Sequence, residues 1–302
     1  MMSRRAASWG LVLVGCVPSF EDRPWRVDEA RIVAIAAEPA EARPGEGVGL
    51  SALVIEPDGV AADIPAWSLC MQPRTAAERT SVSEACATGE GVLGVTNPVA
   101  IPTDSCARFG PNPPPTEGGA PPQRPADPDA SGGYFLPARA DVPSVGVPAF
   151  GFVRLRCDLS GATRAIFDDY ERRYSLNVNP AVEAVQIDGE TVTESPLQAT
   201  SGASIEWTVR PALGAAEPYV FYDEAGGRLE DRVEALTVRW YVTDGVLTRG
   251  EQTIEGQPSQ SESEALSVDW TLPDSPGRVH GWAVVSDERG GVSWAAVVVD
   301  VG

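Results

Sequence analysis

The sequence has 302 residues, a formal net charge of −20 and a hydrophobic fraction of 43%. These values are normal for a folded protein and allow two domains of ordinary size. A negative charge of this size repels phosphate backbones, which argues against a nucleic-acid partner. A solvated surface that keeps the protein in solution explains the acidity, although it would also favour cations or basic partners.

The start of the chain has the features of an export signal. Residues 6–14 are apolar and follow Arg4 and Arg5, but they are too few to span a bilayer, which needs about 20 residues. The run ends in Leu-Val-Gly-Cys at residues 13–16, which resembles the bacterial lipobox. An ordinary signal peptide with an incidental cysteine is one alternative. Twin-arginine export is another, but the apolar pair that it needs does not follow the arginines.

The lipobox predicts that residues 1–15 are a signal peptide and that Cys16 carries a lipid, with residues 16–26 as a tether. Stable anchoring takes more than one acyl chain, and the resemblance implies several chains on this cysteine. Val17 stands where an Asp would favour retention in the inner membrane. We therefore expect an exported outer-membrane lipoprotein that faces the periplasm or the outside. No later segment of the sequence is predicted to span a membrane.

An even number of further cysteines in an exported chain predicts disulfide bonds. The four are Cys70, Cys86, Cys106 and Cys157. They allow three pairings, of which we favour Cys70–Cys86, around one short segment, and Cys106–Cys157, which would link a long loop to a strand. Metal binding by the four is the rival, but no Cys-x-x-Cys spacing is present.

Alternating side chains in the first half predict half-buried strands. One predicted strand places Val48, Leu50, Ala52 and Val54 on a single face. In another, Val153, Leu155 and Cys157 should face the core, and Arg154 and Arg156 should face away from it. Residues 109–133 are rich in Pro and Gly, which predicts a long exposed loop, with a ligand-binding loop as the alternative. Residues 163–175 fit either a short helix or a strand.

The second half contains clearer strand patterns. Asn179-Pro180 interrupts the alternation, so we divide the chain into domains at residues 27–178 and 179–302. Evenly spaced short strands with Gly and Pro turns predict an all-β fold of two immunoglobulin-like sandwiches in tandem. Trp240 should fill the second core, although this half lacks the cysteine pair of true immunoglobulin domains. Residues 277–301 predict a closing hairpin with its turn at residues 287–291.

Several of these segments together resemble a known group of proteins. They are the lipobox, "RIVAIAAEPAEARPGEGVGLSALVIEPDG", "WSLCMQP…SEAC", "VRWYVTDG" and "DERGGVSWAAVVV". This combination is similar to uncharacterised predicted lipoproteins of the myxobacterial type, over most of the chain. The resemblance implies an envelope lipoprotein with immunoglobulin-like domains, and it supplies no activity and no catalytic residues.

The sequence offers little for catalysis. A His-dependent triad or metal site would have to use His280, the one histidine, but its neighbours alternate as in a strand. The motifs G-x-S-x-G and H-E-x-x-H and the phosphate loop are missing. Pairs of acidic residues occur at 168–169, 223–224, 230–231 and 287–288. Two carboxylates could serve glycoside hydrolysis if the fold held them at the right distance, or they could bind Ca²⁺ between domains, but none of these pairs has the spacing of an EF-hand loop. We expect them to be exposed charges in turns. No enzyme, cofactor or metal is predicted.

Residues 218–232 are the candidate ligand-binding stretch. Tyr219, Phe221 and Tyr222 lie beside Asp223, and aromatic rings with carboxylates are typical of carbohydrate or peptide sites. The alternative is that the rings pack onto the sandwich. We predict a lipid-anchored binding or scaffolding module whose partner is an envelope protein or a glycan. The rival is a carbohydrate-binding or weakly carbohydrate-active module that uses this stretch.

Overall fold

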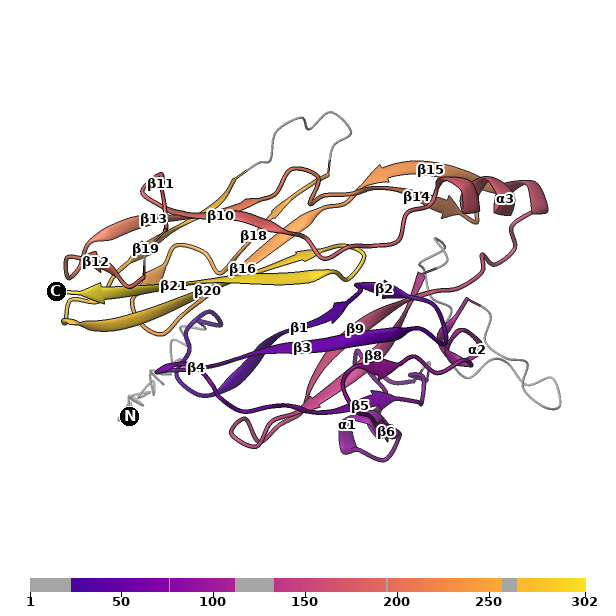
Figure 1. Cartoon of the computed structure of the whole chain (residues 1–302), viewed down its shortest axis with the longest axis horizontal. Coiled ribbons are helices and arrows are strands. Elements are labelled where there is room, and N and C mark those ends of the chain that lie inside the picture. Colours follow the sequence, from indigo (N-terminus) through magenta and orange to yellow (C-terminus); the bar gives the residue numbers. More distant parts are fainter. Residues whose placement is uncertain (1–22, 76, 112–132, 194, 257–264) are drawn as a thin grey trace, which may run out of the picture.

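The structure is a computed structural model, and it describes residues 23–75, 77–111, 133–193, 195–256 and 265–302. Its described residues form mainly β-strands, arranged as two sandwiches that lie side by side (Figure 1). The predicted signal peptide, the lipidation site Cys16 and residues 112–132 of the Pro- and Gly-rich stretch lie outside the described residues.

The first sandwich contains strands β1 to β9. Their bounds are β1 Arg31–Glu38, β2 Glu41–Ala42, β3 Gly47–Glu56, β4 Gly59–Val60, β5 Ala66–Cys70, β6 Val92–Gly94, β7 Val99–Ala100, β8 Gly133–Asp141 and β9 Ala149–Arg156. Two short helices belong to it, α1 (Glu84–Thr88) and α2 (Ser105–Phe109). One sheet has the order β1-β3-β4, with β7 also paired to β3, and the other has the order β2-β9-β8-β5-β6.

The second sandwich follows helix α3 (Arg164–Arg173). Its strands are β10 Val182–Ile187, β11 Glu190–Thr191, β12 Leu197–Ala199, β13 Ser204–Pro211, β16 Leu236–Val242, β17 Val246–Leu247, β18 Glu251–Ile254, β19 Leu266–Thr271, β20 Gly277–Asp287 and β21 Val292–Val301. The sheets have the orders β11-β10-β13-β19-β17 and β12-β21-β20-β16-β18. A separate hairpin, β14 (Pro218–Asp223) and β15 (Arg228–Val233), is inserted between β13 and β16.

Both sandwiches have the strand order of an immunoglobulin domain. The second pairs β10-β13-β19-β17 in one sheet and β21-β20-β16 in the other, which are the A-B-E-D and G-F-C orders. The first repeats this scheme with β1-β3-β7 and β9-β8-β5. In each, a short strand, β2 or β12, runs parallel to the last strand. The predicted all-β, immunoglobulin-like fold is confirmed.

Each sandwich has its own apolar core. The second is built around Trp207, Trp240 and Trp270, which are fully buried, so the predicted position of Trp240 in the core is confirmed. The first contains Leu69, Leu136, Val153 and Leu155. Within residues 163–175 the chain forms helix α3, from Arg164 to Arg173, rather than a strand. Thr163 caps this helix by accepting a hydrogen bond from the Ile166 N–H at 3.4 Å.

A third apolar cluster joins the two sandwiches. It consists of Val27, Ala34, Leu53, Ile55, Trp282 and Val284. The alternation in β3 predicts that Leu53 faces away from the core, but this side chain is buried against the second sandwich. Strand β3 is therefore covered on both faces at its end, because β20 lies over its outer face.

Candidate functional site

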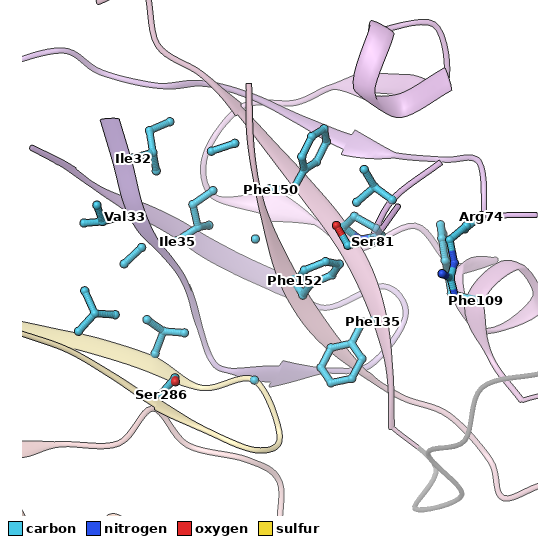
Figure 2. A pocket seen from close by; sticks show the side chains of 18 of the residues that line it. Ile32, Val33, Ile35, Arg74, Ser81, Phe109, Phe135, Phe150, Phe152 and Ser286 are labelled. Atoms are coloured by element: carbon cyan, nitrogen blue, oxygen red, sulfur yellow. The ribbon is translucent and has the colours of Figure 1, made fainter. Parts of the chain in front are cut away.

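A groove of about 730 Å³ lies between the two sandwiches. Residues of β1, β8 and β9 line one side, and residues of β20, β21 and their connecting turn line the other. The segment that carries Arg74 and Ser81 borders one end. Figure 2 shows the rings of Phe150, Phe152 and Phe135 in succession along the groove. The volume lies in the range of ligand sites, which are often found where domains meet.

The alternation of β9 places its aromatic side chains in the groove. Val153 and Leu155 face the core of the first sandwich, so Phe150 and Phe152 face the opposite way. Phe135 comes from the paired strand β8, and its ring meets that of Phe152 edge to face at 6.2 Å between centroids. Three aromatic rings therefore lie on a sheet face that would ordinarily be polar.

The turn between β20 and β21 closes one side of the groove against Phe135. Gly290 has φ +98°, and a Cβ at this position would lie 2.9 Å from the Phe135 ring. Only glycine combines this backbone conformation with this close approach. The side chains of Gln72, Arg74 and Ser81 are exposed at the groove. The arrangement offers an apolar surface with hydrogen-bonding groups at its edge.

The predicted disulfide pairings are the ones in the structure. Cys70 pairs with Cys86 and Cys106 with Cys157, at Cα–Cα distances of 5.5 Å and 5.6 Å. The first disulfide packs with Val82 behind Phe150 and Phe152. It therefore supports one wall of the groove, through a segment that has little regular secondary structure.

A buried charge cluster lies beside the groove, around Arg289. This arginine is 2% exposed and forms ion pairs with Glu234 and, at 3.0 Å, with Glu217. The third guanidinium nitrogen, Nη1, donates to the Ser175 carbonyl at 3.0 Å and to the Tyr174 hydroxyl at 3.3 Å. One cation thus holds two carboxylates of the second sandwich and the segment that enters it.

Asp287 and Glu41 extend the cluster toward the first sandwich. Asp287 accepts hydrogen bonds from the Gly291 N–H at 2.8 Å and from the Asn177 amide at 3.2 Å. Glu41 accepts from the Tyr174 hydroxyl at 2.7 Å and from the Asn177 N–H at 2.9 Å. The hairpin turn predicted at residues 287–291 is present, but the prediction that Asp287 is an exposed turn charge is wrong: its side chain is buried, and Asn177 of the segment between the sandwiches lies against it.

Residues 174–180 connect the sandwiches and bind both of them. The Asn179 amide donates to the Ala37 carbonyl at 2.8 Å, and its oxygen accepts from the Val292 N–H at 2.8 Å. A single side chain thereby links β1 to β21. The connection is a bonded joint rather than a free linker, so the groove has a fixed shape.

The arginines of β9 also depart from expectation. Arg154 and Arg156 are 1% and 7% exposed. Arg154 lies 3.6 Å from the Glu41 carboxylate. Arg156 donates to the Tyr170 hydroxyl at 2.6 Å and pairs with Glu171. The prediction that both face away from the core is correct, but α3 and the segment after it bury them.

Burial changes the acidity of the cluster. It raises the pKa of Glu234 to about 7, with a further contribution from the like charge of Asp287 and an opposing one from Arg289. Burial also raises the pKa of Asp287 and of Glu217. The folded protein therefore holds protons at this joint that the unfolded chain releases.

We expect the Glu234 carboxyl to make the free energy of unfolding fall as the pH rises from about 4.5 to about 7. Within this window the unfolded chain loses its proton first, so raising the pH favours unfolding, and above it the contribution is gone. The pKa of surface Asp300 is lowered from 3.8 by Arg278, so its opposing effect lies below this window, whereas His280, whose pKa burial lowers from 6.5, opposes the fall inside it. Urea midpoints of the wild type and of Glu234→Gln, which cannot titrate at this position, isolate the contribution of Glu234. Relative to Glu234→Gln, the wild type should lose stability as the pH rises; a difference that stays constant or grows in favour of the wild type would contradict the expectation.

The candidate contacts of residues 218–232 are mostly covered. Tyr219 and Tyr222 are buried, and the Tyr219 hydroxyl donates to Glu288. The Phe221 ring lies 3.6 Å from the Arg232 guanidinium. Asp223 accepts a hydrogen bond from the Gly226 N–H at 3.0 Å within its own turn. The structure brings these side chains together on one hairpin, but it directs the tyrosine rings into the protein.

The one histidine of the sequence lies in β20, where it is half-buried. The His280 ring stacks on the Trp282 ring with 5.8 Å between their centroids. Burial lowers the pKa of His280. The described residues contain no group of three His, Cys, Asp or Glu side chains that could hold a metal ion. Among these same residues, no helix has the length and apolar character needed to cross a membrane.

Sequence reasoning missed the phenylalanines of the groove. In β9, Phe150 and Phe152 alternate with Val153 and Leu155 on the opposite face. A strand that is apolar on both faces has both faces covered or one available for binding. The sequence contains this pattern, but it does not show that the second sandwich lies across the groove.

Comparisons with known proteins add little. No protein-family model matches the sequence, and no curated protein matches it. Among solved structures, the adhesin InvE of Yersinia pseudotuberculosis is 13% identical, with a TM-score of 0.22, over 89% of this chain and 58% of the adhesin. The fibronectin(III)-like modules of Clostridium thermocellum CbhA are 11% identical, with a TM-score of 0.24, over 90% of this chain and 93% of theirs. At these TM-scores the likenesses carry no argument about this protein.

Proposed function

We propose that the protein is a lipid-anchored binding module of the cell envelope that holds an apolar part of a partner between its two sandwiches. The observation that carries this proposal is the row of Phe135, Phe150 and Phe152 along a groove of about 730 Å³. Large apolar side chains that line a cavity with a polar edge are typical of binding sites. The lipobox at Cys16 supports attachment to a membrane, which would concentrate the module at a surface.

The carbohydrate module of the sequence analysis has less support. It depends on the rings of Tyr219 and Tyr222, and both are buried. A sugar stacks on an exposed aromatic face, which these two residues do not provide. The groove does have two carboxylates in its lining, those of Asp287 and Glu288. Both already accept hydrogen bonds within the protein, Asp287 from the Gly291 N–H and the Asn177 amide and Glu288 from the Tyr219 hydroxyl, so we propose binding without catalysis.

The binding role is tested by photo-crosslinking in intact cell envelopes. A photoreactive phenylalanine analogue replaces Phe152 in the groove or, as a matched control, the half-buried Phe167 on α3. We expect a discrete adduct from position 152 and none from position 167. Ser286→Trp, which fills the groove without removing its phenylalanines, should abolish the adduct. Equal adducts at both positions, or an adduct that survives Ser286→Trp, would contradict binding in the groove.

The anchor is tested separately. Both proteins are expressed at full length in a host that lipidates exported proteins. The wild type should sediment with the outer membranes, and Cys16→Ala should remain in the soluble fraction. If both proteins are soluble, the lipobox prediction is wrong and the module acts as a freely diffusing exported protein.

A further inference from the structure

Residues 23–27 precede the first sandwich in the chain but bind the second. We call them the N-terminal strap. The Val27 N–H donates to the Val242 carbonyl at 2.9 Å, and the Val242 N–H donates to the Trp25 carbonyl at 2.9 Å. The sequence assigns residues 23–26 to a tether, but they are part of the fold. The described chain therefore begins on the surface of the second sandwich.

Side chains fasten the strap at the end of β16. Arg26 pairs with Asp244 at 2.9 Å. The Trp25 ring lies where Gly250 leaves room for it, since a Cβ on that glycine would be 2.8 Å from the ring. Val27 is 1% exposed in the cluster between the sandwiches. These contacts give the strap one fixed position.

The β3–β4 turn, the residues that follow β16 and the C terminus lie around the strap. Together with the strap we call this region the strap end. The β3–β4 turn reaches it, because a Cβ on Gly59 would lie 3.4 Å from the His280 ring. The Thr243 N–H donates to the His280 carbonyl at 3.0 Å. Figure 1 shows β4, β12 and the C terminus at this end of the long axis, and α3 with the β14–β15 hairpin at the other.

The short distance along the chain to Cys16 limits how far the strap end can be from a lipid on that residue. Six residues lie between Cys16 and Arg23, and the seven Cα–Cα steps from one to the other span at most about 25 Å when the chain is fully extended. Gly281 of β20 pairs with Val242 beside the strap, and Asp287 at the end of the same strand lines the groove, about 20 Å further along. The β14–β15 hairpin and α3 lie at the opposite end of the long axis (Figure 1). A lipid on Cys16 can therefore lie close to the strap end, and it is kept away from the opposite end.

We propose that the strap end faces the lipid bilayer and that the groove, the β14–β15 hairpin and α3 are presented away from it. This orientation rests on the lipid anchor of the proposed function. Arg26 and Arg278 at this end are paired with Asp244 and Asp300, so a neutral lipid surface matches it better than an anionic one. Val60 and Val246 are exposed there, which suits contact with such a surface.

Energy transfer to labelled lipid tests the orientation. Full-length lipidated protein is placed in phosphatidylcholine vesicles that carry rhodamine on a fraction of their headgroups. A fluorophore is attached to a cysteine introduced by Val246→Cys at the strap end or by Ala225→Cys in the β14–β15 turn. We expect several-fold higher transfer from position 246 than from position 225. Equal or reversed transfer, as from a molecule that lies flat or points the other way, would overturn the proposal.

Two further measurements separate the causes. Flotation of the vesicles reports the anchor alone: protein that does not float overturns the anchor and the orientation together, whereas flotation with equal transfer overturns only the orientation. The double variant Trp25→Ala with Arg26→Ala releases the strap. It should still float, but the difference in transfer between the two labels should shrink, and an unchanged difference would show that the strap does not set the orientation.

Discussion

Above pH 7, where the Glu234 carboxylate is ionised, Arg289→Met is expected to lower the free energy of unfolding by about 3–5 kcal/mol, because it leaves a buried carboxylate without its cation. Glu234 is fully buried, and its ion pair with Arg289 offsets the cost of removing its charge from water. The Arg289 guanidinium lies over the rings of Tyr174 and Tyr219, and Met has a similar length and can pack its thioether against the same rings. The variant therefore removes mainly the charge and its hydrogen bonds.

Urea unfolding measures this loss, with Arg278→Met as the matched control. Arg278 is also paired with an aspartate, Asp300, but at the surface, where ion pairs contribute little. Removing the stranded carboxylate as well, with Glu234→Leu in the Arg289→Met background, should restore part of the stability. If the two methionine variants unfold at the same urea concentration, the cluster does not stabilise the joint.

Removing the disulfide between Cys106 and Cys157 is expected to cost about 4 kcal/mol, against about 3 kcal/mol for the one between Cys70 and Cys86. The physical reason is the loop that each bond closes in the unfolded chain. The sequence separations are 51 and 16 residues, and the longer loop gains more conformational freedom when it is opened. Both figures assume that the folded state changes little.

Alanine pairs at each disulfide test this order by chemical denaturation. Alanine is preferred to serine because Cys70, Cys86 and Cys157 are buried, where an unpaired hydroxyl would add its own cost. Mass spectrometry of an unreduced digest checks the pairing independently. A larger loss for the Cys70–Cys86 variant would mean that this disulfide stabilises the folded groove wall rather than acting through the unfolded chain.

Local patterns were sufficient to predict the strands and much of the fold. The alternation around Trp240 identifies a strand with one face in a core, because side-chain direction in a strand has a period of two. The cysteine count and spacing favoured the pairing that the structure contains. These features depend on residues close in sequence or on a small number of combinations, so the sequence alone could supply them.

The candidate site could not be predicted in the same way. Tyr219 and Asp223 look like ligand contacts in sequence, but the hairpin folds Tyr219 against Arg289. Phe150 and Phe152 were not among the predicted contacts, and they line the groove. Whether an aromatic ring is buried or available depends on what packs over it, and that partner is far away in the chain.

The sequence by itself determined many of the strands and the fold class, it favoured one of three disulfide pairings, and it predicted the lipid anchor. Only the tertiary structure decided which outer strand faces are covered. The two sandwiches lie side by side, so Leu53 and Trp282 meet between them, Arg154 is buried, and Asp287 joins the charge cluster at the joint. Alternation reports that one face of a strand is buried, and the fate of the other face depends on how a second sandwich docks.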